Sequence, residues 1–210
     1  MDPKQIVADG YDSIAEQHEE WASSVRIEER SKYTAVLLEK LPEGADILEL
    51  GCGSGIPTTQ QLAVKFAVTG VDISAKQVEL AQQKVPTAKF IHSDMIHLDF
   101  LEGSFDAIAA FYSMIHVPRQ EQAELLCKIR SWLRPGGLLV ATMGAHSTKA
   151  YFNENFLGKP MYWSNFDSET NRRLVREAGL SIISAKEETA DEFEKPITFL
   201  WIVAQKPVTT

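Results

Sequence analysis

Three glycines at alternate positions stand in the segment Glu49-Leu50-Gly51-Cys52-Gly53-Ser54-Gly55. Glycine allows a tight turn, and it lets the main chain approach a ligand where a Cβ atom would collide. The segment follows an apolar run that begins at Ala45. We therefore expect a turn at the end of a strand, and we expect its backbone to hold a ligand.

Carboxylates also end the next two apolar runs, with Asp72 in the run 66–73 and Asp94 in the run 89–94. The carboxyl ends of parallel strands share one sheet edge, so Glu49, Asp72 and Asp94 would form an acidic rim beside the glycines. Such a rim suits a ligand with hydroxyls, amino groups and a positive charge, which favours a sulfonium nucleoside over a dinucleotide. Alternatively, Asp72 and Asp94 cap the helices that follow them.

The elements that must position these residues alternate between short apolar runs and longer helical patterns. Strands are predicted at 45–51, 66–73, 89–94, 104–113 and 136–144. Helices are predicted at 56–65, at 74–85 with Ser74 as the cap, and at 118–133. This alternation predicts an α/β fold in which helices cover both faces of a parallel sheet.

The segments that flank this core have other patterns. Residues 3–40 are helical in pattern, and residues 145–166 are polar, interrupted by Gly and Pro, and rich in aromatics, which suggests a lid or insertion. A helix at 168–178 precedes two alternating runs, 180–189 and 197–206, which predict a closing antiparallel hairpin. We divide a single domain into a helical N-terminal cover (1–40), a cofactor-binding core (41–144), a lid (145–166), and a final helix and hairpin (167–210).

Composition limits the classes of function. The chain has 210 residues, of which 44% are hydrophobic, and its net charge is −8. A chain of this length predicts one compact domain. Its negative net charge predicts no general attraction for nucleic acid or anionic lipid. The longest apolar stretch, 105–117, is too short to span a bilayer, and the N-terminus lacks the apolar core of a signal peptide, so we expect a cytoplasmic protein. The two cysteines, Cys52 and Cys127, indicate neither a disulfide framework nor a metal site.

The segments ILELGCGSG, GVDIS, SDM, FDAIAAFYSMIH and LRPGGLLVAT occur in this order. Together they resemble the motifs of class I S-adenosylmethionine-dependent methyltransferases of the small-molecule type, closely over residues 45–144 and in outline elsewhere. The resemblance implies a Rossmann-like sheet of seven strands in the order 3-2-1-4-5-7-6, with strand 7 antiparallel. The predicted hairpin at 180–206 fits this order.

The same resemblance implies S-adenosylmethionine as the cofactor. Glu49 would reach its amino group, Asp72 its ribose hydroxyls, and Asp94 the exocyclic amine of its adenine. The remaining cofactor-binding residues implied are Gly51, Cys52, Gly53 and Gly55 at the methionine moiety, Ile73 and Met95 around the adenine, and Ser93 and Phe111 nearby.

The N-terminal segment YDSIAEQHEEW is similar to the Y-D-x-x-A-x-x-Y opening of small-molecule members, in which a helix lies over the cofactor and the first Tyr faces it. Tyr11 is that first Tyr, and His18 stands where the second would be. We therefore expect Tyr11 to contact both the cofactor and the acceptor.

Two histidines are candidate general bases. His116 follows the fourth predicted strand and His146 follows the fifth, near the place where an acceptor would meet the methyl group. Each has the alternative reading of a structural, hydrogen-bonded histidine. Tyr112, Tyr151 and Trp163 are the further candidates for the acceptor pocket, although such aromatics can also pack the insertion onto the core.

These features predict methyl transfer to an oxygen, nitrogen or sulfur nucleophile of a small molecule, without a metal. The fourth-strand segment lacks the (D/N)PP(Y/F) pattern of enzymes that methylate amino groups in nucleic acids. One alternative is an NAD-dependent oxidoreductase or another nucleoside-binding Rossmann protein, although its loop normally reads GxGxxG. A second alternative is a binding module that keeps the cofactor site but has no transfer activity.

Overall fold

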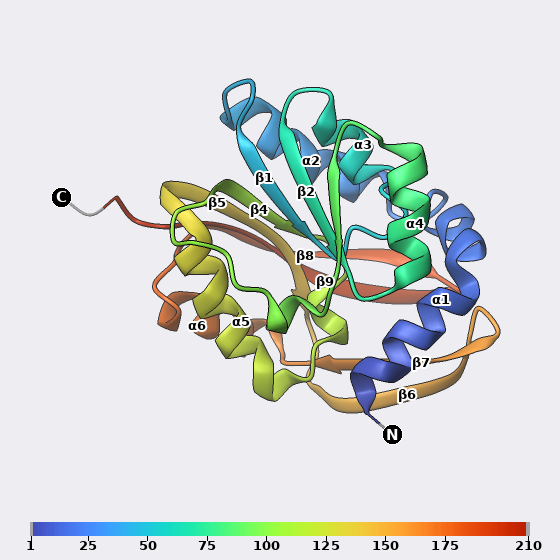
Figure 1. Cartoon of the computed structure of the whole chain (residues 1–210). Coiled ribbons are helices and arrows are strands. Elements are labelled where there is room, and N and C mark those ends of the chain that lie inside the picture. The colour runs from blue at the N-terminus through green and yellow to red at the C-terminus, as the bar shows by residue number, and fades with distance from the viewer. Residues whose placement is uncertain (1, 209–210) are drawn as a thin grey trace.

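The computed structural model describes residues 2–208 of the chain, which form one central sheet with helices on both faces (Figure 1). The strands of this sheet are β1 (Asp46–Leu50), β2 (Ala67–Asp72), β3 (Lys89–His92), β4 (Phe105–Ala110), β5 (Leu133–Gly144), β8 (Ser181–Glu192) and β9 (Lys195–Gln205). Their order is β3-β2-β1-β4-β5-β9-β8, and β9 is antiparallel to both of its neighbours. The predicted strand order and its antiparallel strand are confirmed.

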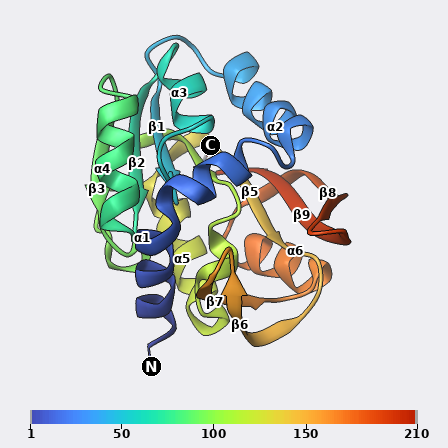
Figure 2. The ribbon, with the colours of Figure 1, turned by 90° about the vertical axis from the view of Figure 1, so that its right-hand side faces the viewer.

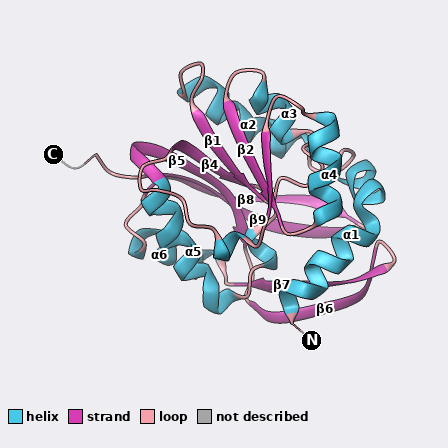
Figure 3. Cartoon of the chain, in the orientation of Figure 1, coloured by secondary structure: helices cyan, strands magenta, loops and turns pink. Residues whose placement is uncertain are grey.

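Two helices precede the sheet, and four lie in connections between its strands (Figure 3). They are α1 (Pro3–Ala22), α2 (Ile27–Lys40), α3 (Thr58–Ala63), α4 (Ala75–Lys84), α5 (Arg119–Trp132) and α6 (Ser168–Glu177), with short 3-10 turns at Met95–His97 and Met114–His116. The Ser74 hydroxyl caps α4 by accepting a hydrogen bond from the Gln77 backbone nitrogen at 3.1 Å. A side-chain cap satisfies one of the free N–H groups at a helix start, so the chain turns from strand to helix at this point.

Two hydrophobic clusters lie on opposite faces of the sheet. Residues of α2 and α3, among them Leu37 and Leu62, pack on one face, where Trp201 stacks on Tyr33 with ring centroids 4.1 Å apart. Residues of α5 and α6 pack on the other face. Burial of both faces explains why the central strands are almost continuously apolar.

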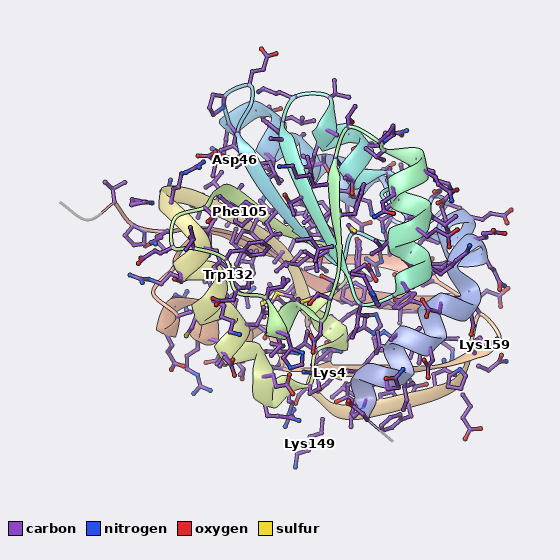
Figure 4. The ribbon with its side chains drawn as sticks, in the orientation of Figure 1. Lys4, Asp46, Phe105, Trp132, Lys149 and Lys159 are labelled. Carbon is purple, nitrogen blue, oxygen red and sulfur yellow. The ribbon has the colours of Figure 1, made fainter. Side chains whose placement is uncertain are left out.

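A separate layer covers the carboxyl ends of the strands. It consists of α1 and a two-stranded hairpin, β6 (Thr148–Phe156) with β7 (Lys159–Asn165), and we call it the cover. Figure 2 shows α1 in front of the sheet, between α4 and this hairpin. Figure 4 places Asp46 and Phe105, at the amino ends of β1 and β4, far from Lys4 on α1. The cover therefore faces the edge at which the acidic rim was predicted.

Apolar packing joins the two parts of the cover. Val7 and Ile14 of α1 form a cluster with Met161 and Tyr162 of β7. Gly10 allows the close approach, because a Cβ atom there would lie 2.7 Å from the Pro160 carbonyl oxygen. An insertion was expected at 145–166, but its strands were not predicted.

The closing hairpin lies where it was predicted, but its strands are longer. Strands β8 and β9 continue pairing to Glu192 and Lys195, and they turn at Phe193 and Glu194, which both have positive φ. The turn between the two predicted strands is thus confined to these two residues. No helix within residues 2–208 is long and apolar enough to cross a membrane.

Candidate cofactor and acceptor site

A cavity of about 830 Å³ lies between the cover and the carboxyl ends of the strands. Its volume is within the range of roughly 300–1,000 Å³ that is typical of small-molecule sites. The sequence-predicted site residues that line it are Tyr11, Glu49, Gly51, Cys52, Gly53, Asp72, Ile73, Met95, Phe111, Tyr112, His116, His146, Tyr151 and Trp163. The fold thus brings both the cofactor candidates and the acceptor candidates to one space.

Three of the predicted cofactor residues do not line this cavity. Ser93 and Asp94 border a small adjoining void of about 40 Å³, which they share with Asp72 and Met95. Gly55 faces α4, where a Cβ atom would lie 3.1 Å from Val85 Cγ2. The φ of Gly55 is +80°, so close packing and backbone conformation account for this glycine without a ligand.

Asp72 and the glycine turn hold one another. One carboxylate oxygen of Asp72 accepts from the Gly53 nitrogen at 2.8 Å, and the other accepts from the Ser74 nitrogen at 2.9 Å. Burial is the main reason why the pKa of Asp72 is raised, and these two hydrogen bonds oppose the rise. Asp72 therefore holds the backbone just before α4, whose cap is Ser74, and it also lines the cavity.

The first two glycines of the turn have different surroundings. A Cβ atom at Gly51 would lie 2.2 Å from Ser113 Cβ, so this position must be glycine for the loop to pack on the end of β4. At Gly53 a Cβ atom would meet only Gln77 Oε1, at 3.8 Å. The space above Gly53 is therefore open to a ligand that contacts the main chain.

Glu49 is a buried carboxyl at the end of β1. It accepts a hydrogen bond from the Thr59 hydroxyl. Burial raises its pKa to about 8, and Asp72 adds to the rise, whereas Thr59 and the nearby positive charge of Arg30 oppose it. A cationic group in the cavity next to Glu49 would favour its ionised form.

Asp94 is already engaged by neighbouring groups. One oxygen accepts from the Ile96 nitrogen at 3.0 Å and caps the 3-10 turn, and the other lies 2.8 Å from Lys4 Nζ. Lys4 also pairs with Glu121, at 2.5 Å. Asp94 thus links the acidic rim to the start of α1.

His116 and Tyr11 form a hydrogen-bonded pair at the cavity. The His116 Nδ1 lies 2.7 Å from the Tyr162 carbonyl oxygen, which can only accept, so Nδ1 carries the proton. The His116 Nε2, 2.9 Å from Tyr11 Oη, is then the acceptor for the Tyr11 hydroxyl. Burial lowers the pKa of His116 to about 4, although the bond to Tyr162 opposes this, and burial raises the pKa of Tyr11. Both groups are therefore neutral at pH 7.

The other predicted acceptor residues lie around this pair. Trp163 packs on His116 with ring centroids 5.5 Å apart, and Tyr151 packs on Trp163 at 5.8 Å. His146 is exposed at the cavity wall. Next to Tyr11, His18 lies edge-on at 4.8 Å, and burial lowers its pKa to about 4.

Several cavity residues were not predicted from the sequence. Trp21 of α1 stacks on Phe193 of the β8–β9 turn, with centroids 5.4 Å apart and planes 8° from parallel. The Arg26 guanidinium pairs with Glu192 of the same hairpin and donates to the Ile197 carbonyl oxygen. Further unpredicted residues are Arg30, Asn153, Asn155, Phe156 and Asn165. They come from segments far apart in the chain, and only Trp21 lies in a segment that the sequence analysis singled out, YDSIAEQHEEW.

The chain is similar in sequence to known methyltransferases. The family model described as a methyltransferase domain matches residues 47–137. A curated relative, 2-methyl-6-phytyl-1,4-hydroquinone methyltransferase of Synechocystis, is 33% identical over 130 residues, which are 59% of this chain and 40% of that protein. The chain thus matches less than half of the length of this relative.

Solved structures share the fold. Magnesium protoporphyrin IX methyltransferase of Synechocystis, with bound S-adenosylhomocysteine, has a TM-score of 0.74 and 19% identity over 98% of this chain and 100% of its own. The 1,6-didemethyltoxoflavin-N1-methyltransferase of Burkholderia thailandensis, with bound 1,6-didemethyltoxoflavin and S-adenosylhomocysteine, has a TM-score of 0.69 and 21% identity over 95% and 86%. In its ordered motifs, in the match over residues 47–137 and in its strand order, the chain is similar to the class I S-adenosylmethionine-dependent methyltransferases, and it shares their fold.

Proposed function

We propose that the protein transfers a methyl group from S-adenosylmethionine to an oxygen, nitrogen or sulfur nucleophile of a small, partly apolar acceptor. The observation that carries this proposal is one continuous cavity with the glycine turn and Asp72 at one side and the Tyr11–His116 pair at another. Residues 41–144 would form the cofactor-binding core, residues 1–40 and 145–166 would cover it, and residues 167–210 would complete the sheet.

The glycine turn together with Glu49 and Asp72, which we call the cradle, fits the cofactor. Gly53 leaves open space above its main chain, and Asp72 is a buried carboxylate that is suited to a ribose diol. Glu49 would accept from the ammonium group, and Ile73 and Met95 would enclose the adenine. Gly51, Cys52 and Phe111 would border the methionine side, while Ser93, Asp94 and Gly55 support the cradle from outside the main cavity.

The cofactor supplies a methyl group on a positively charged sulfur, which a nucleophile takes by in-line displacement. The protein must therefore align the acceptor and exclude water. The cover does both in this proposal: Trp163 and Tyr151 would border the acceptor, with Tyr112 at another wall.

A proton must leave an O–H, N–H or S–H acceptor during the transfer. The proton would pass to Tyr11 Oη while the Tyr11 proton moves to His116 Nε2, which already accepts from it. His116 is a weak base because its pKa is about 4. A weak base suffices, since the acceptor proton becomes strongly acidic as the methyl group bonds. His146 is the second candidate base, and an acceptor that is already ionised needs neither.

Calorimetry with S-adenosylhomocysteine tests the cofactor site. Wild type should bind it, whereas Asp72→Ala and Gly53→Val should lose binding by 100-fold or more, on the order expected for losing a buried charged contact and filling the cradle. Asp99→Ala, at an exposed aspartate, is the matched control for the first variant. Gly44→Val is the control for the second, because Gly44 has a φ of +76° and open surroundings.

Unaltered binding in both cradle variants would contradict the proposal. Fluorescence enhancement of NADH by the wild-type protein would instead support a dinucleotide oxidoreductase. Mass spectrometry of a metabolite extract incubated with isotopically labelled cofactor then identifies the acceptor. Binding of the cofactor without any labelled product would indicate a module without transfer activity.

A further inference from the structure

The turn between β8 and β9 has a backbone conformation that its residue types do not favour. Glu192 pairs with Lys195, so the loop consists of Phe193 and Glu194. Both have positive φ, +50° and +62°, as in the type I′ turn that two-residue hairpin loops prefer. Asn-Gly suits such a turn, whereas a bulky residue with positive φ costs free energy. Strained residues of this kind cluster at ligand sites, so the turn points to a role for the Phe193 side chain.

The turn places the Phe193 ring at the mouth of the main cavity. The ring lines the cavity although the residue is 56% exposed. It stacks on Trp21 of α1, with ring centroids 5.4 Å apart and planes 8° from parallel. The Arg26 guanidinium, at the start of α2, pairs with the neighbouring Glu192. The end of the hairpin is therefore fixed beside α1 and α2, and it carries an aromatic side chain to the cavity.

Phe156, at the end of β6, forms a corner with these two rings, and we call Trp21, Phe156 and Phe193 the aromatic corner. The plane of Phe156 lies 86° from that of Trp21 and 80° from that of Phe193, at centroid distances of 5.6 and 6.1 Å. Trp163 continues this wall from Phe156, at 5.2 Å, to His116. All of these rings line the cavity. A planar aromatic ligand in the corner can stack on one ring and meet another edge to face, the two arrangements that aromatic rings prefer.

The charged groups beside the aromatic corner do not favour a charged ligand. Arg26 pairs with both Glu29 and Glu192, so these charges neutralise one another. Lys195 also lines the cavity, but it is exposed, so water can solvate its ammonium group. Because burial of an unpaired charge costs free energy, the corner suits an uncharged group.

We propose that the aromatic corner selects a planar, uncharged aromatic acceptor, and that Phe193 determines this specificity. The acceptor ring packs against the corner, and its nucleophilic atom faces the Tyr11–His116 pair. The inference rests on the proposed function and narrows its small, partly apolar acceptor to one chemical class. It also gives the strained turn a role, since an Asn-Gly turn would form more easily but would leave no ring at this wall of the cavity.

Two probes with the same carbon skeleton test the aromatic corner. They are 2-naphthol, which offers a flat ring for stacking, and decahydro-2-naphthol, which is saturated and puckered. Both are titrated by calorimetry into protein that is saturated with S-adenosylhomocysteine. Wild type should bind 2-naphthol about 5- to 30-fold more tightly, the ratio expected for one stacked and one edge-to-face ring pair. Burial of apolar area alone would give no such preference.

Variants of Phe193 should change this preference. Phe193→Asn removes the ring and keeps a residue that tolerates positive φ, so the preference should fall to about a third of the wild-type value or less. Phe193→Tyr keeps the ring and should keep the preference. Phe152→Asn is the matched control, because Phe152 is 52% exposed on the same cover and does not line the cavity.

Thermal unfolding separates this role from a structural one. Glu194→Gly relieves the turn and keeps the ring, so the Tm should rise by about 2–4 °C while the preference stays unchanged. In Phe193→Asn the relief of the turn and the loss of the stack on Trp21 should offset one another to within about 2 °C. A lower Tm with an unchanged preference would show that Phe193 only supports the fold, and it would overturn the inference.

Further outcomes distinguish this inference from the proposed function. S-adenosylhomocysteine is titrated first, without a probe, and a failure to bind it would contradict the proposed function together with the inference. If it binds but wild type binds the two probes equally, or binds neither, the inference alone is overturned.

Discussion

The two sides of the cavity are built differently. The cradle is made of main chain that follows β1 and β2, and the parallel ladder fixes it, because Gly51 and Cys52 both donate to the Val71 carbonyl oxygen. Within residues 2–208 the cover pairs with no strand of the main sheet. Side chains hold it there, among them Asp12, which accepts from the Ser74 hydroxyl, Glu19, which pairs with Lys84, and Lys4, which pairs with Asp94.

This difference allows one chain to bind a cofactor that is always the same and an acceptor that can differ between relatives. A cradle of backbone groups recognises features that never change, such as a ribose or an amino acid. A wall of side chains from α1, the β6–β7 hairpin and the β8–β9 turn can change its shape by substitution without disturbing the sheet. Segments held by few side-chain contacts also open at lower free energy than core strands, which would allow ligand entry.

The largest loss of stability is expected at Gly51, where the surroundings leave no room for a Cβ atom. Gly51→Ala places a Cβ atom 2.2 Å from Ser113 Cβ, in addition to the cost of a positive φ. We expect a loss of more than about 4 kcal/mol in the free energy of unfolding, measured by urea denaturation with Trp fluorescence. Gly44→Ala is the control, since its φ of +76° carries the conformational cost, about 1–2 kcal/mol, without a contact. Equal losses in both variants would show that packing at Gly51 does not matter.

A substitution inside the cover should destabilise the cover and leave the sheet intact. Met161 is fully buried between α1 and β7, so Met161→Ala should cost about 2–4 kcal/mol. Hydrogen exchange should then accelerate in α1, β6 and β7 while β1, β4 and β5 stay protected. Phe152→Ala, at a side chain of the same hairpin that is 52% exposed, should change little. Uniform acceleration over the whole chain would mean that the cover and the sheet unfold as one unit.

Acid should also weaken the contact between the cover and the sheet, through the neutral His116, which holds Tyr11 of α1 and Tyr162 of β7. Burial lowers the pKa of His116 to about 4, whereas an unfolded histidine has a pKa of about 6.5. The unfolded state therefore binds the proton first, so the stability that is present above pH 6.5 falls as the pH drops towards 4. At pH 5 the loss from His116 amounts to about 2 kcal/mol.

His116→Gln should flatten this acid dependence, as followed by urea denaturation between pH 7 and pH 5. His97→Gln is the matched control, because the His97 side chain is 74% exposed. His18, whose pKa is also lowered to about 4 by burial, should contribute a separate and similar term. An acid dependence that is the same in His116→Gln and wild type would refute the neutral, hydrogen-bonded state of His116.

Sequence patterns predicted the cradle well because its signals are local. The glycine turn and the lining positions of Glu49 and Asp72 follow from residues that are neighbours in sequence or end successive strands, whereas the strand order followed from the family resemblance. The roles assigned to these residues, and to Tyr11 and His116, stay predictions until ligands are measured.

The cover was harder to predict, because long-range contacts determine it. In the part of the chain that the structure describes, β6 and β7 pair only with one another. Most side chains of β6 are exposed, so its residues lack the regular apolar alternation of a strand. Arg26 and Arg30 stand in a charged segment typical of a solvated helix start, and only the folded chain brings them to Glu192 and Tyr112. The engagement of Asp94 by Lys4 was likewise beyond any local pattern.

The smallest effect is expected at this Lys4 contact, which joins the cover to the cradle. Ion pairs near the surface contribute about 0–1 kcal/mol, so Lys4→Gln should lower the free energy of unfolding by no more than that. If Asp94 accepts from the adenine amine, as the family resemblance implies, it must give up part of its pairing with Lys4. Removing Lys4 then abolishes that cost, and the affinity for S-adenosylhomocysteine should rise by about two- to fivefold, which corresponds to at most about 1 kcal/mol. Lys76→Gln, at an exposed lysine that pairs with Glu79 on α4, should leave the affinity unchanged. A weaker affinity in Lys4→Gln would instead show that Lys4 holds the cover closed over the bound ligand, and that Asp94 serves the cover rather than the adenine.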